Sequence, residues 1–215
     1  MSTETNTAAN TSTNTFTNTS KTLALFDFDG TITRKDSLVG FIQHAVGKPR
    51  YYAGLIKLSP MLSAFLLKKI PNDQAKTRFI SHYFKGWNSD NFEQCANQYS
   101  LEQLDKIVRP GAITKIKWHQ AQGHQVMVVS ASMVSWLRGW CERHQLGLIA
   151  TEMQVSDGKL TGQFATPNCH GAEKVKRVSE VCDLDRYDTI YAYGDSSGDS
   201  EMLALADERF YQPFR

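Results

Sequence analysis

The chain has 215 residues, 41% of them hydrophobic, and a formal net charge of +2. This length fits one sizeable domain, or a domain with a large insertion, and is enough to bury a proper core. A charge this small, without a long basic run, argues against a nucleic-acid-binding surface, so we expect no nucleic-acid partner. The four cysteines form no Cys-x-x-Cys pair, which indicates reduced thiols in a cytoplasmic protein.

Residues 1–22 are mostly Thr, Asn, Ser and Ala, and they lack the basic start and hydrophobic middle of a secretory signal. They predict a disordered tail. Residues 23–26 are apolar and predict a buried parallel strand that ends in Asp27 and Asp29. Two residues apart on a strand, these carboxylates would point to one face, and their repulsion indicates that a cation or an electrophile lies between them.

Residues 37–107 are helical in character throughout, with no evident strand, and predict a four-helix insertion. The segment 51–70 is the most apolar region of the chain and is interrupted by Pro60. Asn72 or Asp73 is expected to cap the next helix, and a last helix is expected over about 89–107.

Strands and helices are expected to alternate after the insertion: helix 110–123, strand 125–130, helix 133–145, strand 148–150, hairpin 155–160, helix 171–182, strand 189–193, helix 200–206 and strand 209–211. This alternation predicts an α/β fold, a doubly wound, Rossmann-like parallel sheet with a helical cap inserted after the first strand. Residues 23–36 and 108–215 would then form the catalytic core, and residues 37–107 the cap.

Polar side chains follow three of the expected strands: the acidic pair, Ser130 and Asp195. The carboxyl ends of parallel strands meet at one edge of a sheet, so these groups can form one site. Clustered carboxylates without His or Cys favour a hard cation such as Mg²⁺. Lys174, one turn into its helix, supplies further positive charge. Carboxylates, Mg²⁺, a hydroxyl and an ammonium together predict a phosphate site.

Four segments, in this order, resemble the motifs of the haloacid dehalogenase (HAD) superfamily of phosphotransferases. They are Asp-Phe-Asp-Gly-Thr at 27–31, Val-Val-Ser at 128–130, Lys174, and Gly-Asp-Ser-Ser-Gly-Asp at 194–199. A helical insertion between the first two motifs resembles the subgroup that contains phosphoserine phosphatase. Four motifs in the right order are a far more specific signal than any one of them.

The resemblance implies a Mg²⁺-dependent phosphomonoester hydrolase that acts on a small phosphorylated metabolite. Asp27 would be the nucleophile that forms an aspartyl-phosphate, and Asp29 the general acid and base. The metal would be held by Asp27, the main-chain carbonyl of Asp29, and Asp195, while Asp199 would orient Lys174 or a metal-bound water. The implied phosphate-binding residues are Ser130, Lys174, Gly30 and Thr31.

Substrate choice is expected to lie in the cap. The resemblance places Asp36 where it would face a substrate amine, although Asp36 fits the N-cap of the first cap helix equally well. Lys76 or Arg78 would meet a substrate carboxylate. Gly198 stands where the subgroup has a side-chain amide, and a small polar amino acid does not need the apolar segment 51–70, so both features disfavour phosphoserine.

Three alternatives stay open. The segment 51–70 resembles lipid-phosphate phosphatases that act on phosphatidylglycerophosphate, although its interruptions favour packing inside the cap over membrane contact. A phosphomutase would use the same acid–base pair. A non-enzymatic phospho-aspartate signalling domain is disfavoured, because receiver domains lack a large helical cap. None of the six histidines has metal spacing, and none is assigned a role, although His170 is nearest to the expected site.

Overall fold

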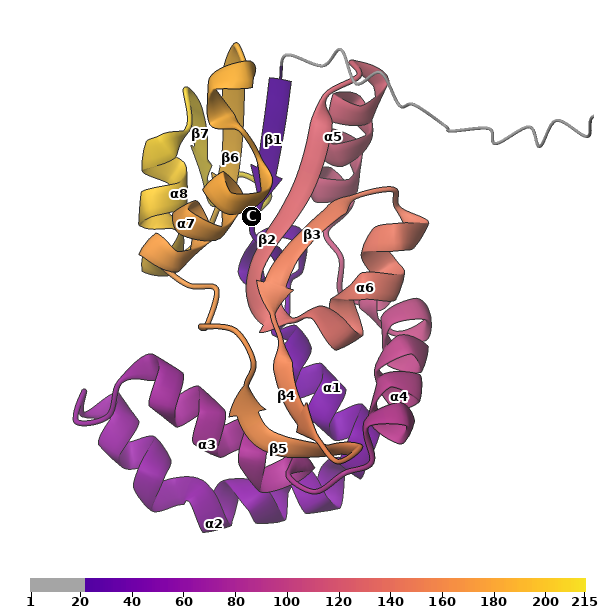
Figure 1. Ribbon diagram of the computed structural model, residues 1–215, viewed down its shortest axis with the longest axis vertical. Helices are drawn as coiled ribbons and strands as arrows, with labels where there is room; N and C mark the ends of the chain where they lie inside the picture. The colour runs from indigo at the N-terminus through magenta and orange to yellow at the C-terminus, as the bar shows by residue number, and fades with distance from the viewer. Residues whose placement is uncertain (1–21) are drawn as a thin grey trace, which may run out of the picture.

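The structure, a computed structural model, describes residues 22–215, so nearly all of the expected tail lies outside the described residues. Its centre is a five-stranded parallel sheet in the order β3-β2-β1-β6-β7 (Figure 1). The strands are β1 (Thr22–Phe26), β2 (Gln125–Met133), β3 (Gly147–Thr151), β6 (Thr189–Gly194) and β7 (Glu208–Tyr211). The expected α/β fold is confirmed. Thr22, assigned to the tail from the sequence, is the first residue of β1.

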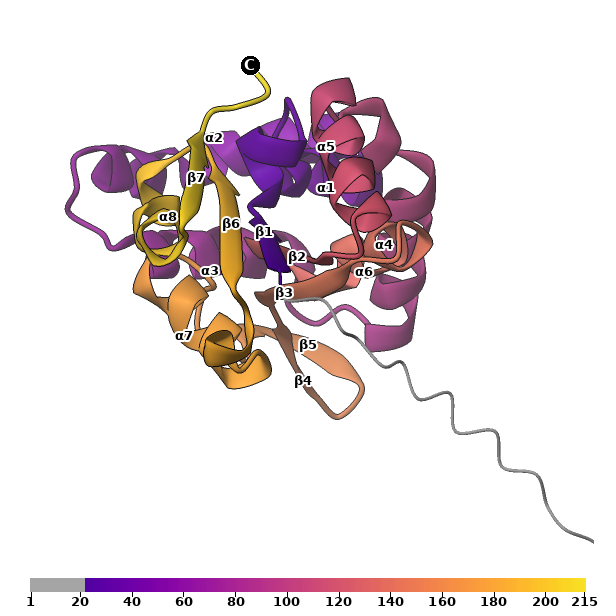
Figure 2. The same ribbon diagram turned by 90° about the horizontal axis from the view of Figure 1, so that it is seen from above.

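Helices cover both faces of the sheet, as Figure 2 shows from above. They are α5 (Pro110–Ala121), α6 (Val134–Arg143), α7 (Ala172–Val181) and α8 (Ser200–Leu205). Alternate residues of β1 point to opposite faces. Ala24 and Phe26 belong to the core that includes residues of α5 and α6, whereas Leu23 and Leu25 pack with residues of α7 and α8. Because both faces are buried, the strand is apolar at every position.

The insertion forms four helices beyond the carboxyl ends of the strands (Figure 1). They are α1 (Ser37–Val46), α2 (Lys48–Leu66), α3 (Asn72–Phe84) and α4 (Ser89–Glu102). Phe41 of α1 lies at their centre, with its ring centroid 5.3 Å from that of Phe84 and 4.7 Å from that of Trp136. Trp136 belongs to α6, so aromatic packing joins the insertion to the sheet layer.

Several expected helix boundaries are wrong. Pro60 lies inside α2 without ending it, because the residue is exposed and water can bond the carbonyl that loses its donor. The N-cap of α3 is Pro71, and neither Asn72 nor Asp73 caps that helix. The last helix of the insertion ends at Glu102 and is followed by a short 3₁₀ turn, Leu104–Lys106.

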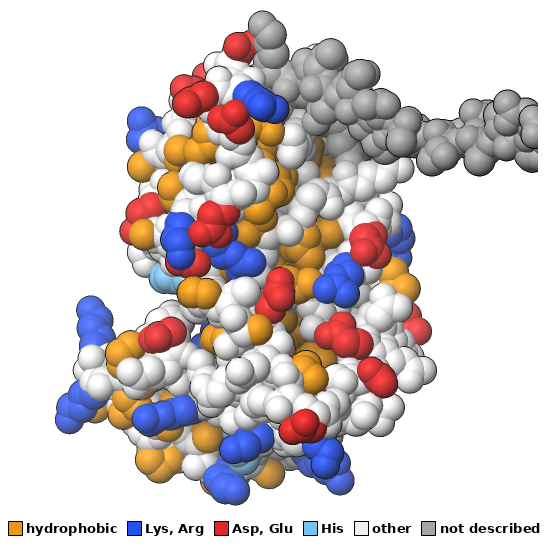
Figure 3. All heavy atoms as spheres, viewed as in Figure 1, with side chains coloured by type: hydrophobic (Ala, Val, Ile, Leu, Met, Phe, Trp, Pro, Cys, Tyr) orange, Lys and Arg blue, Asp and Glu red, His pale blue; other side chains and the backbone are white. Residues whose placement is uncertain are grey.

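The expected packing of the segment 51–70 inside the cap applies to one face of α2 only. Tyr51 and Gly54 are its buried residues, whereas Tyr52, Ile56 and Leu66 are 55%, 76% and 79% exposed. Apolar and basic side chains therefore lie together on the surface of this part of the molecule, at the lower left of Figure 3. Within residues 22–215, no helix combines the length and the apolar character that a membrane span requires.

The expected hairpin is confirmed and consists of β4 (Met153–Ser156) and β5 (Lys159–Phe164). Its turn residues, Asp157 and Gly158, both have positive φ, as a two-residue hairpin turn requires. The hairpin reaches from β3 to the insertion. The amide of Gly86 donates to the carbonyl of Leu160 at 2.8 Å, and the amide of Leu160 donates to the carbonyl of Trp87 at 2.9 Å.

Candidate active site

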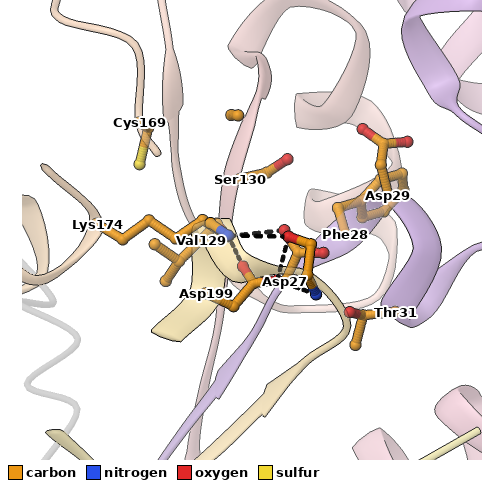
Figure 4. A network of polar contacts seen from close by, with 12 residues as sticks. Asp27, Phe28, Asp29, Thr31, Val129, Ser130, Cys169, Lys174 and Asp199 are labelled. Carbon is orange, nitrogen blue, oxygen red and sulfur yellow. Dashed lines mark hydrogen bonds and ion pairs between the residues drawn. The ribbon is translucent and has the colours of Figure 1, made fainter. Parts of the chain in front are cut away.

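The acidic pair lies just beyond the end of β1. The strand ends at Phe26, Asp27 follows, and Phe28–Ile32 forms an irregular helical turn with φ of +91° at Gly30. The expectation that both carboxylates share one strand face is therefore wrong. As Figure 4 shows, Asp29 is directed away from the group formed by Asp27 and Lys174. The turn gives the two carboxylates separate surroundings.

Lys174, from the first turn of α7, connects the carboxylates at the centre of the site. Its Nζ lies 2.7 Å from Oδ1 of Asp27, 2.7 Å from Oδ1 of Asp199 and 2.7 Å from the carbonyl of Val129 (Figure 4). The side chain is almost completely buried. Burial alone would lower the pKa of Lys174, but the two carboxylates raise it above its ordinary value, so the ammonium stays charged.

Asp27 and Asp199 share this lysine but differ in their titration. Burial raises the pKa of Asp27 to about 6, with Lys174 opposing the shift. Burial would also raise the pKa of Asp199, but Lys174 and further donors hold it below its ordinary value. Oδ2 of Asp199 accepts from the amides of Asp195 and Ser196 and from the Ser196 hydroxyl. Asp199 is therefore a fixed anion that holds Lys174 in place.

Three carboxylates are close enough to hold one metal ion. Oxygens of Asp27, Asp195 and Asp199 lie within 4.8 Å of one another. An oxygen-only donor set fits Mg²⁺, and the charges of Asp199 and Asp195 add to the burial that raises the pKa of Asp27, a repulsion that a cation would offset. Oδ1 of Asp199 is bonded to Lys174 and its Oδ2 accepts three further hydrogen bonds, whereas each oxygen of Asp195 has one partner, the Thr31 hydroxyl or Arg215, so Asp199 is the more fully occupied of the two. The carboxylate of Asp29 lies outside this group, which leaves only its main-chain carbonyl for the implied metal contact.

Two implied phosphate-binding residues lie beneath the site instead of lining it. The hydroxyl of Thr31, a buried residue, donates to Oδ1 of Asp195 at 3.4 Å. A Cβ on Gly30 would lie 2.4 Å from Oδ2 of Asp195, so this glycine allows the carboxylate to approach the turn. Neither residue borders the cavity above Asp27. The structure thus indicates that both support Asp195.

Asp29 is bonded to the insertion and to β2 at once. Its Oδ1 accepts from the amide of Ser37 at 2.6 Å, and its Oδ2 accepts from the hydroxyls of Ser37 at 3.0 Å and Ser132 at 2.5 Å. Burial, followed by the charge of Asp36, raises the pKa of Asp29 to about 7, against the lowering effect of the Ser132 and Ser37 bonds. At neutral pH this carboxyl group is divided between its protonated and ionised forms.

These groups open into a cavity of about 140 Å³. It is lined by Asp27, Asp29, Asp36, Leu38, Lys76, Ser130, Ala131, Ser132, His170, Lys174, Ser196, Gly198 and Asp199. Ser130 is buried, and its Oγ accepts from the amide of Ser132 at 3.0 Å. Carboxylates, hydroxyls and an ammonium around one cavity match the phosphate site that the strand-end residues predict.

A sequence model of the haloacid dehalogenase-like hydrolases matches residues 24–204. The chain belongs to this family. The hydrolase is 35% identical over 201 residues to the protein CicA of Caulobacter vibrioides, in an alignment that covers 90% of this chain and 86% of CicA. It is 30% identical over 198 residues to a probable phosphatase of Mycobacterium tuberculosis, with coverages of 86% and 66%. The motif-based resemblance is confirmed, and so is the expectation of an enzyme.

Solved structures share the fold of the hydrolase. A Bordetella pertussis protein of unknown function matches with a TM-score of 0.75 at 20% identity, over 87% of this chain and 88% of that one. A substrate-bound phosphoserine phosphatase matches with a TM-score of 0.62 at 19% identity, over 88% of this chain and 84% of that one. At these identities the likeness is one of fold.

Of the expected cap residues, Lys76 and Asp36 border the cavity. Nζ of Lys76 donates to the carbonyl of Ala131 at 2.5 Å and to Oδ1 of Asn168 at 3.0 Å, and burial lowers its pKa to about 8. Arg78 is exposed and does not line the cavity, because residues two apart on a helix do not share a face. Asp36 caps α1, because its Oδ1 accepts from the amide of Val39, and it also lines the cavity. Its contact with a substrate amine stays a prediction.

Sequence reasoning missed Ser37, Ser132 and His170. Ser132 lies two residues after Ser130, which is a signal for the same strand face, but the strand was expected to end at Ser130. Ser37 looked like an ordinary first residue of a helix. His170 was given no role, yet it lines the cavity, and burial, followed by the charge of Lys174, lowers its pKa.

Proposed function

We propose that this hydrolase is a Mg²⁺-dependent phosphomonoesterase that acts through an aspartyl-phosphate on Asp27. One observation carries the proposal: two carboxyl groups on one cavity have opposite surroundings. Asp27 is paired with the Lys174 ammonium, whereas Asp29 is bonded to hydroxyl and amide groups and has a pKa of about 7. Carboxyl groups with different hydrogen-bond and charge partners are suited to separate roles.

In the first step, a carboxylate oxygen of Asp27 attacks the phosphorus atom and the ester P–O bond breaks. Asp29 in its protonated form donates its proton to the leaving alkoxide. A pKa of about 7 leaves a large fraction of Asp29 protonated at neutral pH, which suits a general acid. The bonds from Ser37 and Ser132 hold the carboxyl group in a fixed orientation.

In the second step, Asp29, now ionised, removes a proton from a water molecule that attacks the phosphorus atom of the aspartyl-phosphate. The acyl-phosphate P–O bond breaks, inorganic phosphate is released and the Asp27 carboxylate is regenerated. Lys174 and the hydroxyl of Ser130 stabilise the phosphoryl oxygens in both steps. Lys174 is held for this role by Asp199, which bonds it at 2.7 Å.

Asp27, Asp195 and the carbonyl of Asp29 would hold the magnesium ion. When bound, this cation supplies positive charge that neutralises the phosphoryl oxygens. The phosphate cavity, about 140 Å³ in volume, has room for the phosphoryl group and is lined by Asp36, Leu38 and Lys76 on the side of the insertion, so the rest of the substrate extends toward the helices of the insertion.

The test is hydrolysis of p-nitrophenyl phosphate, with inorganic phosphate measured as the product. We expect activity with Mg²⁺, loss of activity with EDTA, and its return when Mg²⁺ is added. Asp27→Asn is expected to abolish turnover, whereas Asp90→Asn, an exposed carboxylate in the first turn of α4, serves as the matched control. Mass spectrometry of the acid-quenched wild type should find the phosphoryl group on Asp27.

Full activity of Asp27→Asn would refute the proposed nucleophile. A requirement for a bisphosphate, with transfer of the phosphoryl group to a second hydroxyl, would instead assign a phosphomutase.

A further inference from the structure

A second, larger cavity adjoins the phosphate cavity on the side of the insertion. This outer chamber has a volume of about 340 Å³ and shares Asp36, Leu38, Lys76, Ala131 and His170 with the phosphate cavity. On the face drawn in Figure 3, the surface is indented at the left, between the part that carries α7 and α8 and the part that carries α2 and α3. The continuity of the two cavities means that a molecule with its phosphate near Asp27 can extend into the outer chamber.

The walls of the outer chamber are mainly apolar. Leu62 and Phe65 come from α2, Ala75 and Phe79 from α3, and Leu38 from α1. These side chains are only partly buried, apart from Ala75. Each therefore keeps apolar surface that a bound molecule would remove from water. The polar groups, Asn72, Asn168, Lys76, Asp36 and His170, complete the lining.

Lys76 is already engaged at this junction. Its ammonium is bonded to the Ala131 carbonyl and to Asn168, so two of its three N–H groups are occupied by the protein itself. A polyhydroxylated group that lay against Leu62, Phe65 and Phe79 would find no partners for its hydroxyls on these side chains. Leaving such polar groups buried without partners is unfavourable.

We propose that the outer chamber binds an alkyl chain, so that the substrate is a phosphomonoester of an apolar alcohol. This proposal rests on the proposed phosphomonoesterase activity. The phosphate lies near Asp27 and Lys174, the ester oxygen faces Asp29, and the alkyl chain lies against Leu62, Phe65 and Phe79. Removal of apolar surface from water supplies the selectivity.

The first experiment compares kcat/KM for ethyl, butyl, hexyl and octyl phosphate with Mg²⁺, each below its critical micelle concentration. We expect kcat/KM to rise about fourfold per added methylene, which corresponds to about 0.8 kcal/mol, until the chamber is filled. A kcat/KM that stays constant or falls with chain length would overturn this inference. It would leave the proposed phosphomonoesterase activity standing. If none of these esters nor p-nitrophenyl phosphate is hydrolysed, the proposed function itself fails.

The second experiment removes the chamber wall. Phe65→Ala and Leu62→Ala are expected to lower the ratio of kcat/KM for octyl phosphate to that for ethyl phosphate by about tenfold. Leu66→Ala is the matched control, since Leu66 is a neighbouring apolar residue of α2 that is 79% exposed and does not line the chamber. A ratio that changes equally in Phe65→Ala and Leu66→Ala would contradict the inference. The chain-length series on the wild type decides the question if a variant does not fold.

An alkyl phosphate can come from solution or from a membrane. Turnover of monomeric octyl phosphate, without turnover of phosphatidic acid in phosphatidylcholine vesicles, assigns a soluble substrate to the outer chamber. Comparable turnover of octyl phosphate and of phosphatidic acid in vesicles identifies a lipid as the substrate. In each case Phe65→Ala should reduce turnover of the long-chain ester more than Leu66→Ala does, and equal effects would again contradict the inference.

Discussion

The imidazole of His170 fills the space that a side chain at position 198 would need. A Cβ on Gly198 would lie 2.4 Å from Nε2 of His170, closer than non-bonded atoms approach. Both residues line the phosphate cavity. At position 198 this chain has glycine where the phosphoserine phosphatase pattern has a side-chain amide. The glycine therefore leaves the space that the imidazole of His170 occupies.

We expect Gly198→Asn to displace His170 and to lower the free energy of unfolding by about 1–3 kcal/mol through overpacking. It should also lower kcat/KM for p-nitrophenyl phosphate by about tenfold, because both residues line the phosphate cavity. The double variant Gly198→Asn/His170→Ala removes the collision and should recover most of this loss relative to His170→Ala alone. If the two substitutions act independently, with losses that simply add, the predicted competition for space is wrong.

The pH dependence of kcat/KM is expected to follow Asp29, because the first step needs its protonated form. The rate should fall above a pH of about 7. Ser132→Ala removes a hydrogen bond that lowers the pKa of Asp29, so the fall should move to higher pH by about one unit. Asp36→Asn removes a charge that raises this pKa and should move the fall to lower pH.

Asparagine still caps a helix, so the Asp36→Asn variant should keep α1 intact. Shifts of the two profiles in the same direction would contradict the assignment of the titration to Asp29. Ser135→Ala is a useful control, because the hydroxyl of Ser135 is bonded to Glu93 on the surface.

Gly30→Ala should weaken Mg²⁺ binding and abolish the Mg²⁺-dependent activity. Its Cβ would collide with the Asp195 carboxylate, and its φ of +91° adds strain. Gly86→Ala is a matched control, because Gly86 also has a positive φ of +84° but has nothing within 4 Å of its Cβ position. Both variants should lose about 1–2 kcal/mol of unfolding free energy, whereas only Gly30→Ala should lose Mg²⁺ affinity in calorimetric titration. Equal loss of Mg²⁺ affinity would attribute the effect to strain alone.

His119 makes the stability of the fold depend on pH. Burial, followed by the charges of His124 and Lys115, lowers its pKa to about 3. Below a pH of about 6.5 the unfolded chain binds a proton here and the folded chain does not, so the free energy of unfolding decreases as the pH falls toward 3. Between pH 6.5 and 5, this amounts to about 2 kcal/mol.

Urea unfolding at pH 7 and pH 5 measures this effect. The variant His119→Gln removes the titrating group and keeps a polar side chain for the Tyr193 hydroxyl, which lies 2.9 Å from Nε2 of the histidine. The variant should lose less stability than the wild type between the two pH values. An equal loss would show that other groups cause the decrease.

The sequence predicts the sheet and the motif residues well, because their signals are local. Leu23 to Phe26 are apolar in a row, since both faces of a parallel strand are buried, and Asp27 and Asp195 follow directly on their strands. Lys174 is predicted as the positive charge of the site because it lies one turn into its expected helix. These residues come together because the five strands of the central sheet are parallel and their carboxyl ends share one edge.

The contacts between the insertion and the sheet could not be predicted in the same way. Whether Lys76 or Arg78 faces the cavity depends on the rotation of α3, which packing fixes. Ser37 and Ser132 are separated by 95 positions, and their meeting at Asp29 depends on the turn after β1 and on the continuation of β2. His170 faces the cavity because a residue from another segment, Gly198, leaves space for it.

The hairpin that follows β3 limits how far the insertion can be exchanged as a separate unit. It continues from the sheet, yet its main-chain bonds to Gly86 and Trp87 join it to the insertion. Grafting residues 37–107 alone onto another hydrolase would leave those backbone groups without their partners. An exchange of substrate preference between relatives therefore requires that the insertion and the hairpin be transferred together, although 44 residues separate Glu102 from Gly147 and the strand that leads into the hairpin.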